Sequence, residues 1–251
     1  MEKPITESIT SADNAIDCIS WISGYETEVD VEAASKRIVQ FFDLQYFAFG
    51  ALYKSVEQEH YRYIFGFAPD WCYRYIQNKW YAIDPFIGYA LKNTLPILAS
   101  DIPLTSPGQH RMMDAAIDRG FRSGIFVPVH SASSSWIGLL YLWTGEENNQ
   151  VRRSFDTHRN LMRTFGLELL EWCDARLHAN SLTDYNLDQL DEDLLRKAQE
   201  NLTVTESAYE IGITFSLAKS RYTQLLQKLN VSNKHCAIEK AISLGIIKPA
   251  S

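Results

Sequence analysis

The apolar positions in the first part of the chain repeat at two different spacings. Residues 30–42 place apolar side chains at every third or fourth position, and this spacing predicts an amphipathic helix. Elsewhere, apolar and aromatic residues form short runs separated by polar turns, which is typical of strands. Two hairpins are therefore predicted: 46–54 with 61–67, and 124–130 with 136–144.

Helix-capping residues divide the segment between these hairpins. The pairs Asp84-Pro85 and Ser106-Pro107 each place an N-cap side chain directly before a proline in the first helical turn. Residues 95–99 are a short strand candidate. This part of the chain is thus predicted to be an α-β-α sandwich, in which helices cover both faces of an antiparallel sheet.

A long apolar repeat follows between residues 151 and 177, with side chains such as Met162, Phe165 and Leu169 at three- and four-residue steps. It predicts a helix longer than a small sheet can cover. Its apolar face packs either in the core of the same chain or partly against a second subunit, and the pattern leaves both open. Residues 179–186 are polar without a periodic pattern and are the best linker candidate.

Four short helices are predicted after residue 187, and two of them are joined by a tight turn. Thr203 and Glu206 form a capping box at the start of one helix. Gly212 ends that helix, and Thr214 caps the next one after a three-residue turn. This arrangement is what a major-groove reader requires, although the spacing alone leaves a generic four-helix bundle open.

The second helix of this pair has a polar face opposite its apolar face. Short and basic side chains on or beside the polar face approach base edges and phosphates closely. We expect DNA contacts from five residues: Ser216, Lys219, Ser220, Arg221 and Thr223. Phe215, at the start of this helix, either touches a thymine methyl group or packs against its neighbours, and we favour packing.

The same region carries a specific resemblance. Residues 213–233, ITFSLAKSRYTQLLQKLNVSN, and the ending AIEKAISLGII resemble the LuxR-type helix-turn-helix, over residues 187–248. The resemblance implies an all-α domain that binds double-stranded DNA. Leu217-Ala218-Lys219 replaces the Thr-Val-Lys that is usual in the family, and this departure changes the operator sequence to be expected rather than DNA binding itself.

The formal charge of −7 at first argues against a nucleic-acid partner, but the charges are unevenly distributed. Residues 1–186 carry 16 basic and 23 acidic side chains, whereas residues 187–251 carry eight of each. After Ile211 there are six cations and one anion, Glu239. This local excess indicates either a surface for phosphates or a solvated lysine face.

Motifs for catalysis and metal binding are missing from the sequence. The four cysteines are scattered, the six histidines lack metal-ligand spacing, and there is neither a GxSxG elbow nor a glycine-rich phosphate loop. We therefore expect no enzyme, no metal and no cofactor. The longest apolar run, Ile137–Trp143, is too short to cross a membrane. Together with the scattered thiols and the lack of a secretory leader, this predicts a cytoplasmic protein.

The residues upstream of the linker resemble a second known domain. Trp71-x-x-x-Tyr75 followed by Asp84-Pro85, and the segment 121–124, resemble the autoinducer-binding domain of LuxR-type quorum-sensing regulators over residues 15–178. The resemblance implies a small-molecule signal, an N-acyl-homoserine lactone, held between the sheet and the helices. It implies that Trp71 donates to the lactone carbonyl, that Asp84 accepts from the ligand amide, and that Tyr75 lines the acyl chain. Without it, the two aromatics would be core residues and Asp84 a helix cap.

Two positions depart from that family at the head group of the ligand. Phe67 stands where a tyrosine usually offers a hydroxyl, and Ala99 stands where a second tryptophan usually packs over the lactone ring. Tyr141, on the last strand, restores a hydroxyl from another direction in our hypothesis. We count Phe67, Ala99, Gly124 and Tyr141 among the ligand-binding residues. The pocket holds a lactone differently, holds a non-lactone signal, or holds nothing.

These observations predict an α+β protein with a ligand-binding domain at 1–178, a linker at 179–186 and a helix-turn-helix domain at 187–251. The expected function is that of a homodimeric, ligand-responsive transcription regulator at a two-fold-symmetric DNA site. Two alternatives stay open. One is a solo regulator that responds to a non-lactone signal or to none, and the other is an anti-activator that forms inactive heterodimers.

Overall fold

The computed structural model describes residues 9–54, 59–66, 69–131, 136–146 and 148–249. The chain forms two compact units, and the boundary between them falls inside one long helix, at Trp172 and Cys173. The first unit contains a sheet, whereas the described residues from Cys173 onward are helical, so the predicted α+β class is confirmed. Within the described ranges, no helix combines the length and the apolar character that crossing a bilayer requires.

The sheet of the first unit has five strands in the order β2-β1-β5-β4-β3. Their bounds are Tyr46–Lys54 (β1), Glu59–Phe65 (β2), Ile97–Leu98 (β3), Ser123–His130 (β4) and Trp136–Thr144 (β5). β4 and β5 are antiparallel, with Phe126 opposite Tyr141, and β3 is also antiparallel to β4. The predicted hairpin at 124–144 is confirmed, and β1 and β2 are neighbours as predicted.

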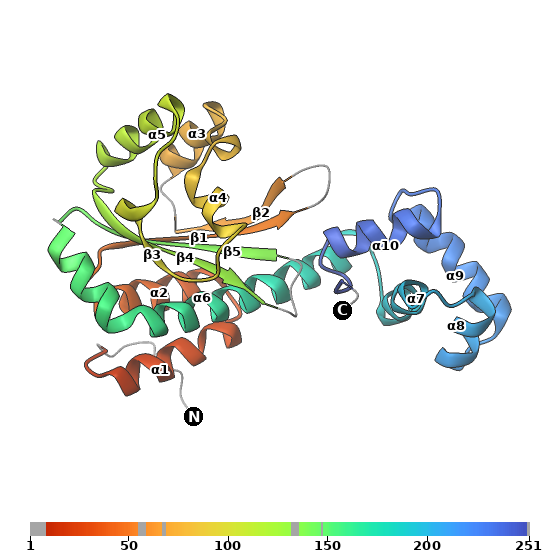
Figure 1. Ribbon diagram of the computed structural model, residues 1–251. Coiled ribbons are helices and arrows are strands. Elements are labelled where there is room, and N and C mark those ends of the chain that lie inside the picture. The colour runs from red at the N-terminus through yellow and green to blue at the C-terminus, as the bar shows by residue number, and fades with distance from the viewer. Residues whose placement is uncertain (1–8, 55–58, 67–68, 132–135, 147, 250–251) are drawn as a thin grey trace. The chain divides into compact units, whose positions relative to one another are not determined.

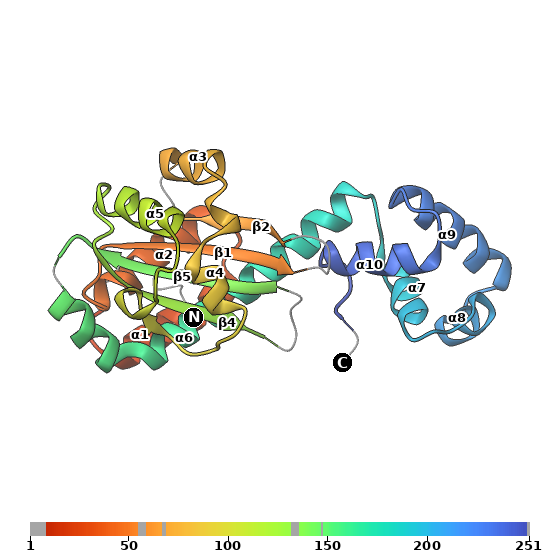
Figure 2. The ribbon, with the colours of Figure 1, turned by 45° about the horizontal axis from the view of Figure 1, so that its top comes forward.

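Helices cover both faces of this sheet (Figure 1 and Figure 2). Over one face lie α3 (Pro69–Gln77), α4 (Pro85–Ala90) and α5 (Pro107–Ile117). Over the other lie α1 (Ala12–Ser20), α2 (Glu28–Phe41) and the first part of α6 (Asn148–Asp184). Three 3-10 turns complete the described part of the unit: η1 (Ile22–Gly24), η2 (Trp80–Ala82) and η3 (Ala99–Asp101). The layers are those of the predicted sandwich, and α1 is a helix that we did not predict.

Local capping chemistry explains where these helices start. Asp84 is the N-cap of α4, and Pro85 occupies the first helical position, where a backbone N–H is not needed. Ser106 caps α5 in the same way, since its hydroxyl accepts from the Gln109 amide at 3.3 Å. Thr27 caps α2. These starts are fixed by residues next to one another in the chain.

The apolar stripe of α6 is buried inside the chain itself. Met162, Phe165 and Leu169 are fully inaccessible, and so are Val151 and Cys173. Between 151 and 173, therefore, intramolecular packing accounts for the apolar repeat. The helix does not stop at 178 but continues to Asp184, so most of the segment that we expected to be a linker is helical.

The second unit contains four short helices at the predicted positions: α7 (Gln189–Gln199), α8 (Val204–Ile211), α9 (Phe215–Lys228) and α10 (Lys234–Ser243). A turn of three residues joins α8 to α9. Gly212 adopts φ +79° in this turn, a left-handed conformation that glycine tolerates without strain, and Thr214 then caps α9. The predicted capping box of Thr203 and Glu206 is present at the start of α8.

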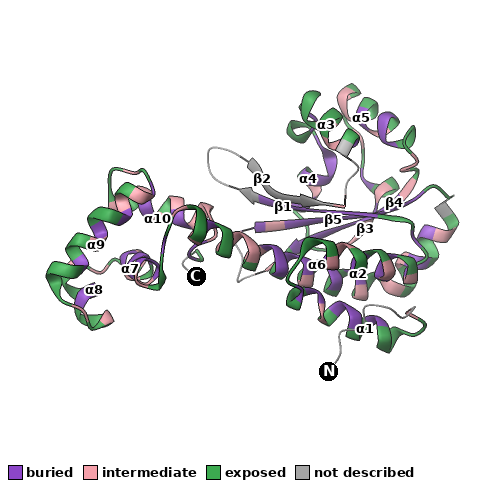
Figure 3. Cartoon of the chain, turned by 180° about the vertical axis from the view of Figure 1, so that it is seen from behind, coloured by how far each residue is buried: buried purple, intermediate pink, exposed green. Residues whose placement is uncertain are grey.

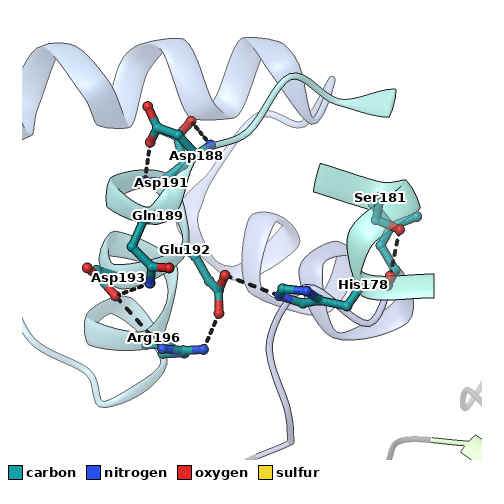
Figure 4. Close-up of polar contacts among 9 residues, drawn as sticks. His178, Ser181, Asp188, Gln189, Asp191, Glu192, Asp193 and Arg196 are labelled. Atoms are coloured by element: carbon teal, nitrogen blue, oxygen red, sulfur yellow. Dashed lines mark hydrogen bonds and ion pairs between the residues drawn. The ribbon is translucent and has the colours of Figure 1, made fainter. Parts of the chain in front are cut away.

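The end of α6 packs on these helices through a small number of contacts. The Ser181 hydroxyl donates to the Leu244 carbonyl at 2.7 Å, and Leu182 and Tyr185 pack against the core that α9 and α10 share. Nε2 of His178 lies 3.1 Å from the buried Glu192 carboxylate (Figure 4). Because only a few separate side chains make these contacts, the last residues of α6 show no apolar repeat in the sequence and resemble a linker.

Candidate functional site

A cavity of about 290 Å³ lies in the first unit, between the sheet and the helices α3 to α5. Its walls come from strands β1 and β5, from the covering helices α3 to α5 and from the turns next to them, and they are almost entirely apolar. The lining residues are Phe47, Ala48, Gly66, Trp71, Cys72, Tyr75, Ile76, Tyr81, Asp84, Phe86, Met112, Met113, Ala116, Phe121, Tyr141 and Trp143. A pocket of this kind suits a small, mainly apolar ligand.

Asp84 is the carboxylate of this cavity. Its Oδ1 accepts from the Phe86 amide at 2.7 Å, and its Oδ2 accepts from the Tyr75 hydroxyl, also at 2.7 Å. Burial raises the pKa of Asp84 to about 6, although the hydrogen bonds from Tyr75 and from the backbone oppose the rise. The side chain can therefore accept from a ligand N–H when ionised, and donate to a ligand oxygen when protonated.

Aromatic rings hold one another in place around this carboxylate. The Trp71 ring lies 5.5 Å from Trp80 and 5.9 Å from Phe121, measured between ring centroids. Phe86 contacts Tyr141 at 5.4 Å and Trp143 at 5.8 Å in edge-on geometry. Such pairs add to the stability that burial provides. The cavity wall is therefore a packed layer rather than a set of independent side chains.

Four of the seven predicted ligand-binding residues line the cavity: Trp71, Tyr75, Asp84 and Tyr141. Gly124 does not line the cavity, but a Cβ atom there would lie 2.4 Å from the ring of Trp143, which does. Ala99 begins η3 and packs against the same apolar cluster without lining the cavity. Phe67 lies outside the described residues.

Most of the remaining wall was missed by the sequence reasoning. Trp143 is the clearest omission, because it lies two residues after Tyr141 on β5 and therefore points to the same face of the strand. That period of two could have identified it. Phe121 belongs to the segment 121–124 that carried the resemblance, but it was not counted among the ligand-binding residues. Met112 and Met113 gave no comparable signal, since they reach the cavity from α5.

A second candidate surface is the outer side of α9. Four of the five predicted DNA contacts are exposed there: Ser216, Lys219, Ser220 and Thr223. Arg221 is different. Its side chain is only 19% exposed and forms ion pairs with Asp188 and with Asp191, the latter at 3.2 Å. The hydrogen bond to Asp188 raises the pKa of Arg221, so the guanidinium is held against α7 in its charged form.

Phe215 and Leu217, in the first turn of α9, are 51% and 44% exposed. We favoured packing for Phe215, and the structure leaves half of this residue open to solvent instead. The reason is its position at the helix start, where neighbouring helices do not yet cover it. Among the described residues, no cluster of three or more histidine, cysteine or acidic side chains is placed to hold a metal ion.

The chain is similar in sequence to known proteins. The family model described as autoinducer binding domain matches residues 27–171. The transcriptional activator protein AhyR of Aeromonas hydrophila is 28% identical over 202 residues, which cover 74% of each chain. RpaR of Rhodopseudomonas palustris, an HTH-type quorum sensing-dependent transcriptional regulator, is 22% identical over 204 residues, 73% of this chain and 74% of its own.

The fold itself resembles solved structures along nearly the whole chain. The crystal structure of Escherichia coli SdiA aligns with a TM-score of 0.64 over 93% of this chain and 97% of that one, at 16% sequence identity. At this identity the likeness concerns the fold. It includes helices on both sides of residue 172, whereas the family match is confined to the first unit.

Proposed function

The chain belongs to the autoinducer-binding domain family, and we propose that it is a transcription regulator whose first unit binds a small signal molecule and whose second unit binds DNA. The observation that carries the proposal is the apolar cavity with the Asp84 and Tyr75 pair, which lies inside the matched segment. The named relatives are regulators of transcription rather than enzymes, and this chain is a regulator too.

The cavity favours a ligand with one donor group and an apolar tail. An N-acyl-homoserine lactone has an amide N–H that fits the Asp84 carboxylate, and its acyl chain fits the aromatic wall. Trp71 is placed in the same wall and would donate its indole N–H to a carbonyl of the head group. A buried amide without such partners would cost roughly 1–3 kcal/mol.

The missing tryptophan at Ala99 favours a second candidate within the same function. Ala99 has no aromatic ring and is not among the described residues that line the cavity, so it cannot pack over a lactone ring as the tryptophan usual in the family would. A solo regulator for a non-lactone signal therefore remains the alternative. Mass spectrometry of small molecules released from the purified protein distinguishes the two, since it identifies the bound compound directly.

The second unit supports a helix-turn-helix domain at 187–251, with α9 in the major groove. The capped start of α8, the three-residue turn and the exposed outer face of α9 together meet the geometric needs of such a domain. Ser216, Lys219, Ser220 and Thr223 would contact DNA. Arg221 would act as a positioning residue, because its pairs with Asp188 and Asp191 fix α9 against α7.

A two-fold-symmetric operator fits a homodimer, which presents two copies of α9 to successive major-groove segments. We keep the predicted ligand-binding domain at 1–178 and the predicted connection at 179–186, while the compact units themselves divide at Trp172 and Cys173 and α6 is helical up to Asp184. An anti-activator would instead need a heterologous partner. Binding of the purified chain alone to a palindromic duplex therefore speaks against that alternative.

The test is ligand-dependent DNA binding by the full chain. Fluorescence anisotropy on a duplex enriched from a random library is measured with and without N-acyl-homoserine lactones of several chain lengths. We expect a lactone to change the affinity, and we expect Asp84→Asn and Trp71→Phe each to weaken this response at least about tenfold. Asp118→Asn, an exposed acid at the end of α5, serves as the matched control and keeps the response.

Two outcomes would contradict these assignments. If both cavity variants respond like the parent chain, the proposed polar contacts are wrong. If no duplex is enriched under any condition, DNA binding by α9 is wrong, whatever the cavity holds.

A further inference from the structure

The first turn of α9 exposes two large apolar side chains that the helical core does not use. Phe215 is 51% exposed and Leu217 is 44% exposed, whereas Ala218, Tyr222 and Leu225 of the same helix are buried. Exposed residues follow the outer side of α8 and α9 in Figure 3. Two such residues within three positions are costly to leave in water, so a surface that covers them in the working complex would stabilise it.

Helical geometry places both side chains at the edges of the polar face. Leu217 shares a row with Ser220 and Gln224, at steps of three and four residues, and Phe215 shares a row with Lys219. Ser216 and Thr223 lie between the two rows. The apolar pair therefore frames a strip of hydroxyl, amide and ammonium groups at the end of the helix that enters a groove first.

Two of the three cations of α9 form ion pairs with acidic residues of the second unit. Arg221 pairs with Asp188 and Asp191, and Nζ of Lys228 lies 2.8 Å from Asp191. Of the three cations in α9, all in the described part of the chain, only Lys219 has no ion pair. Arginine is the commonest reader of guanine because it binds O6 and N7 together. The only arginine of α9 is not presented for that role.

We propose that Phe215 and Leu217 are specificity-determining residues that bind thymine C5-methyl groups in the major groove. The proposal rests on the proposed function, since it requires α9 to bind DNA. The thymine methyl is the apolar group that base edges expose in this groove, and it matches side chains that carry no hydrogen-bonding atoms. Ser216, Ser220 and Gln224 then supply hydrogen bonds beside these contacts.

Uracil substitution tests the proposal, because it removes the methyl group and leaves base pairing intact. The full-length chain first selects a duplex from a random library, and each thymine of that duplex is then replaced in turn by uracil. At one or more positions in each half-site we expect the parent chain to bind about fourfold more weakly, the loss that corresponds to one buried methyl-sized group. Fluorescence anisotropy gives each Kd.

Variants assign the effect to the two side chains. Phe215→Ala and Leu217→Ala should each abolish the uracil penalty at its own position, whereas Phe215→Leu and Leu217→Met keep an apolar contact and should retain it. Val29→Ala shortens an exposed apolar residue of the first unit and should retain every penalty. Circular dichroism of each variant checks that the helices are intact.

The outcomes separate this proposal from the function on which it rests. A selected duplex that tolerates uracil at every thymine overturns methyl recognition while DNA binding stands. Penalties that persist in both alanine variants overturn the assignment to Phe215 and Leu217. If no duplex is selected, DNA binding fails and the proposal fails with it. Loss of a protein partner by the alanine variants, with uracil penalties unchanged, overturns it in favour of a protein interface.

Discussion

The two units bury carboxylates in opposite ways. In the first unit the described hydrogen-bond donors to Asp84 are the neutral Tyr75 hydroxyl and the Phe86 amide, and burial raises its pKa to about 6. In the second unit Asp191 is completely buried, but it lies against Arg221 and Lys228 of α9. The partners of Asp84 are thus neutral, whereas Asp191 is paired with two cations.

This difference matches the roles proposed for the two units. A buried carboxyl group without a cation offers its hydrogen-bonding capacity to a ligand, at a cost to the stability of the empty protein. A carboxyl group that pairs with two cations of one helix fixes the position of that helix. Figure 4 shows the start of α7, where Asp188 and Asp191 form a capping box. The Glu192 carboxylate there contacts His178 and forms an ion pair with Arg196.

The largest effect is expected from Asp191→Asn. The substitution removes the charge that Arg221 and Lys228 share and leaves both cations partly buried, which should destabilise the second unit by about 3–5 kcal/mol. Hydrogen exchange of the α7 and α9 amides, followed by mass spectrometry in the full chain, measures this loss.

Asp193→Asn is the matched control for that change. Asp193 is on the same helix, and its pair with Arg196 at 3.8 Å is exposed, so the control should cost less than about 0.5 kcal/mol. Equal protection of α9 in both variants would show that the buried ion pairs do not hold this helix.

The next effect is a pH dependence confined to the first unit. Because the pKa of Asp84 is raised from 3.8 to about 6, the folded state binds this proton more tightly than the unfolded state. Its contribution to stability is full below pH 3.8 and is lost as the pH rises through about 6. The loss amounts to about 3 kcal/mol. Asp84→Asn stays neutral and should escape it.

Urea unfolding followed by tryptophan fluorescence measures this effect without interference from the second unit. All six tryptophans lie at or before Trp172, so their emission reports the first unit. The free energy of unfolding of Asp84→Asn, relative to the parent, should rise by about 2.5 kcal/mol between pH 4 and pH 7.5. Parallel pH curves for the two proteins would mean that Asp84 does not titrate as described.

Gly124→Ala should give a smaller loss, again in the first unit. The added Cβ would meet the Trp143 ring at 2.4 Å and the Leu142 carbonyl oxygen at 2.7 Å, so the cavity wall must shift. Overpacking of this kind costs about 1–3 kcal/mol. Gly88→Ala is the control, because nothing lies within 4 Å of its added Cβ and α4 is helical there.

The control Gly88→Ala should instead raise the free energy of unfolding. Replacing a helical glycine by alanine in open space stabilises by roughly 0.5–1 kcal/mol. Tryptophan-detected unfolding compares both variants with the parent. A Gly124→Ala protein as stable as the parent, and with unchanged ligand response, would remove the reason for glycine at this position.

Features that depend on residues close together in the chain could be predicted from the sequence. Asp84-Pro85, Ser106-Pro107 and the Thr203 capping box act on backbone groups within three residues, so the helix starts were predictable. Trp71, Tyr75 and Asp84 came from family resemblance, and the structure brings them together in one cavity.

The features that escaped prediction depend on distant partners. Arg221 looked like a DNA contact from its position beside the polar face, but Asp188, 33 residues earlier in the chain, holds it against α7. The residues near the end of α6 lack an apolar repeat, because single contacts hold them: Ser181 donates to the carbonyl of Leu244, the C-cap of α10, and the Tyr185 ring makes a cation–π contact with Lys240. No local pattern encodes such contacts.

The smallest effect is expected at Thr214, where capping bears directly on the helix proposed to enter DNA. The Thr214 hydroxyl accepts from the Leu217 amide at 3.3 Å, so Thr214→Ala should cost about 1 kcal/mol and loosen the first turn of α9. Hydrogen exchange should increase at residues 215–218 and not in α7. Thr205→Ala, an exposed position inside α8, removes a hydroxyl that caps no helix and should change neither. Because Phe215 and Leu217 lie in this turn, DNA affinity should fall along with its protection. Unchanged affinity despite faster exchange would separate capping from recognition and place the DNA contacts further along α9.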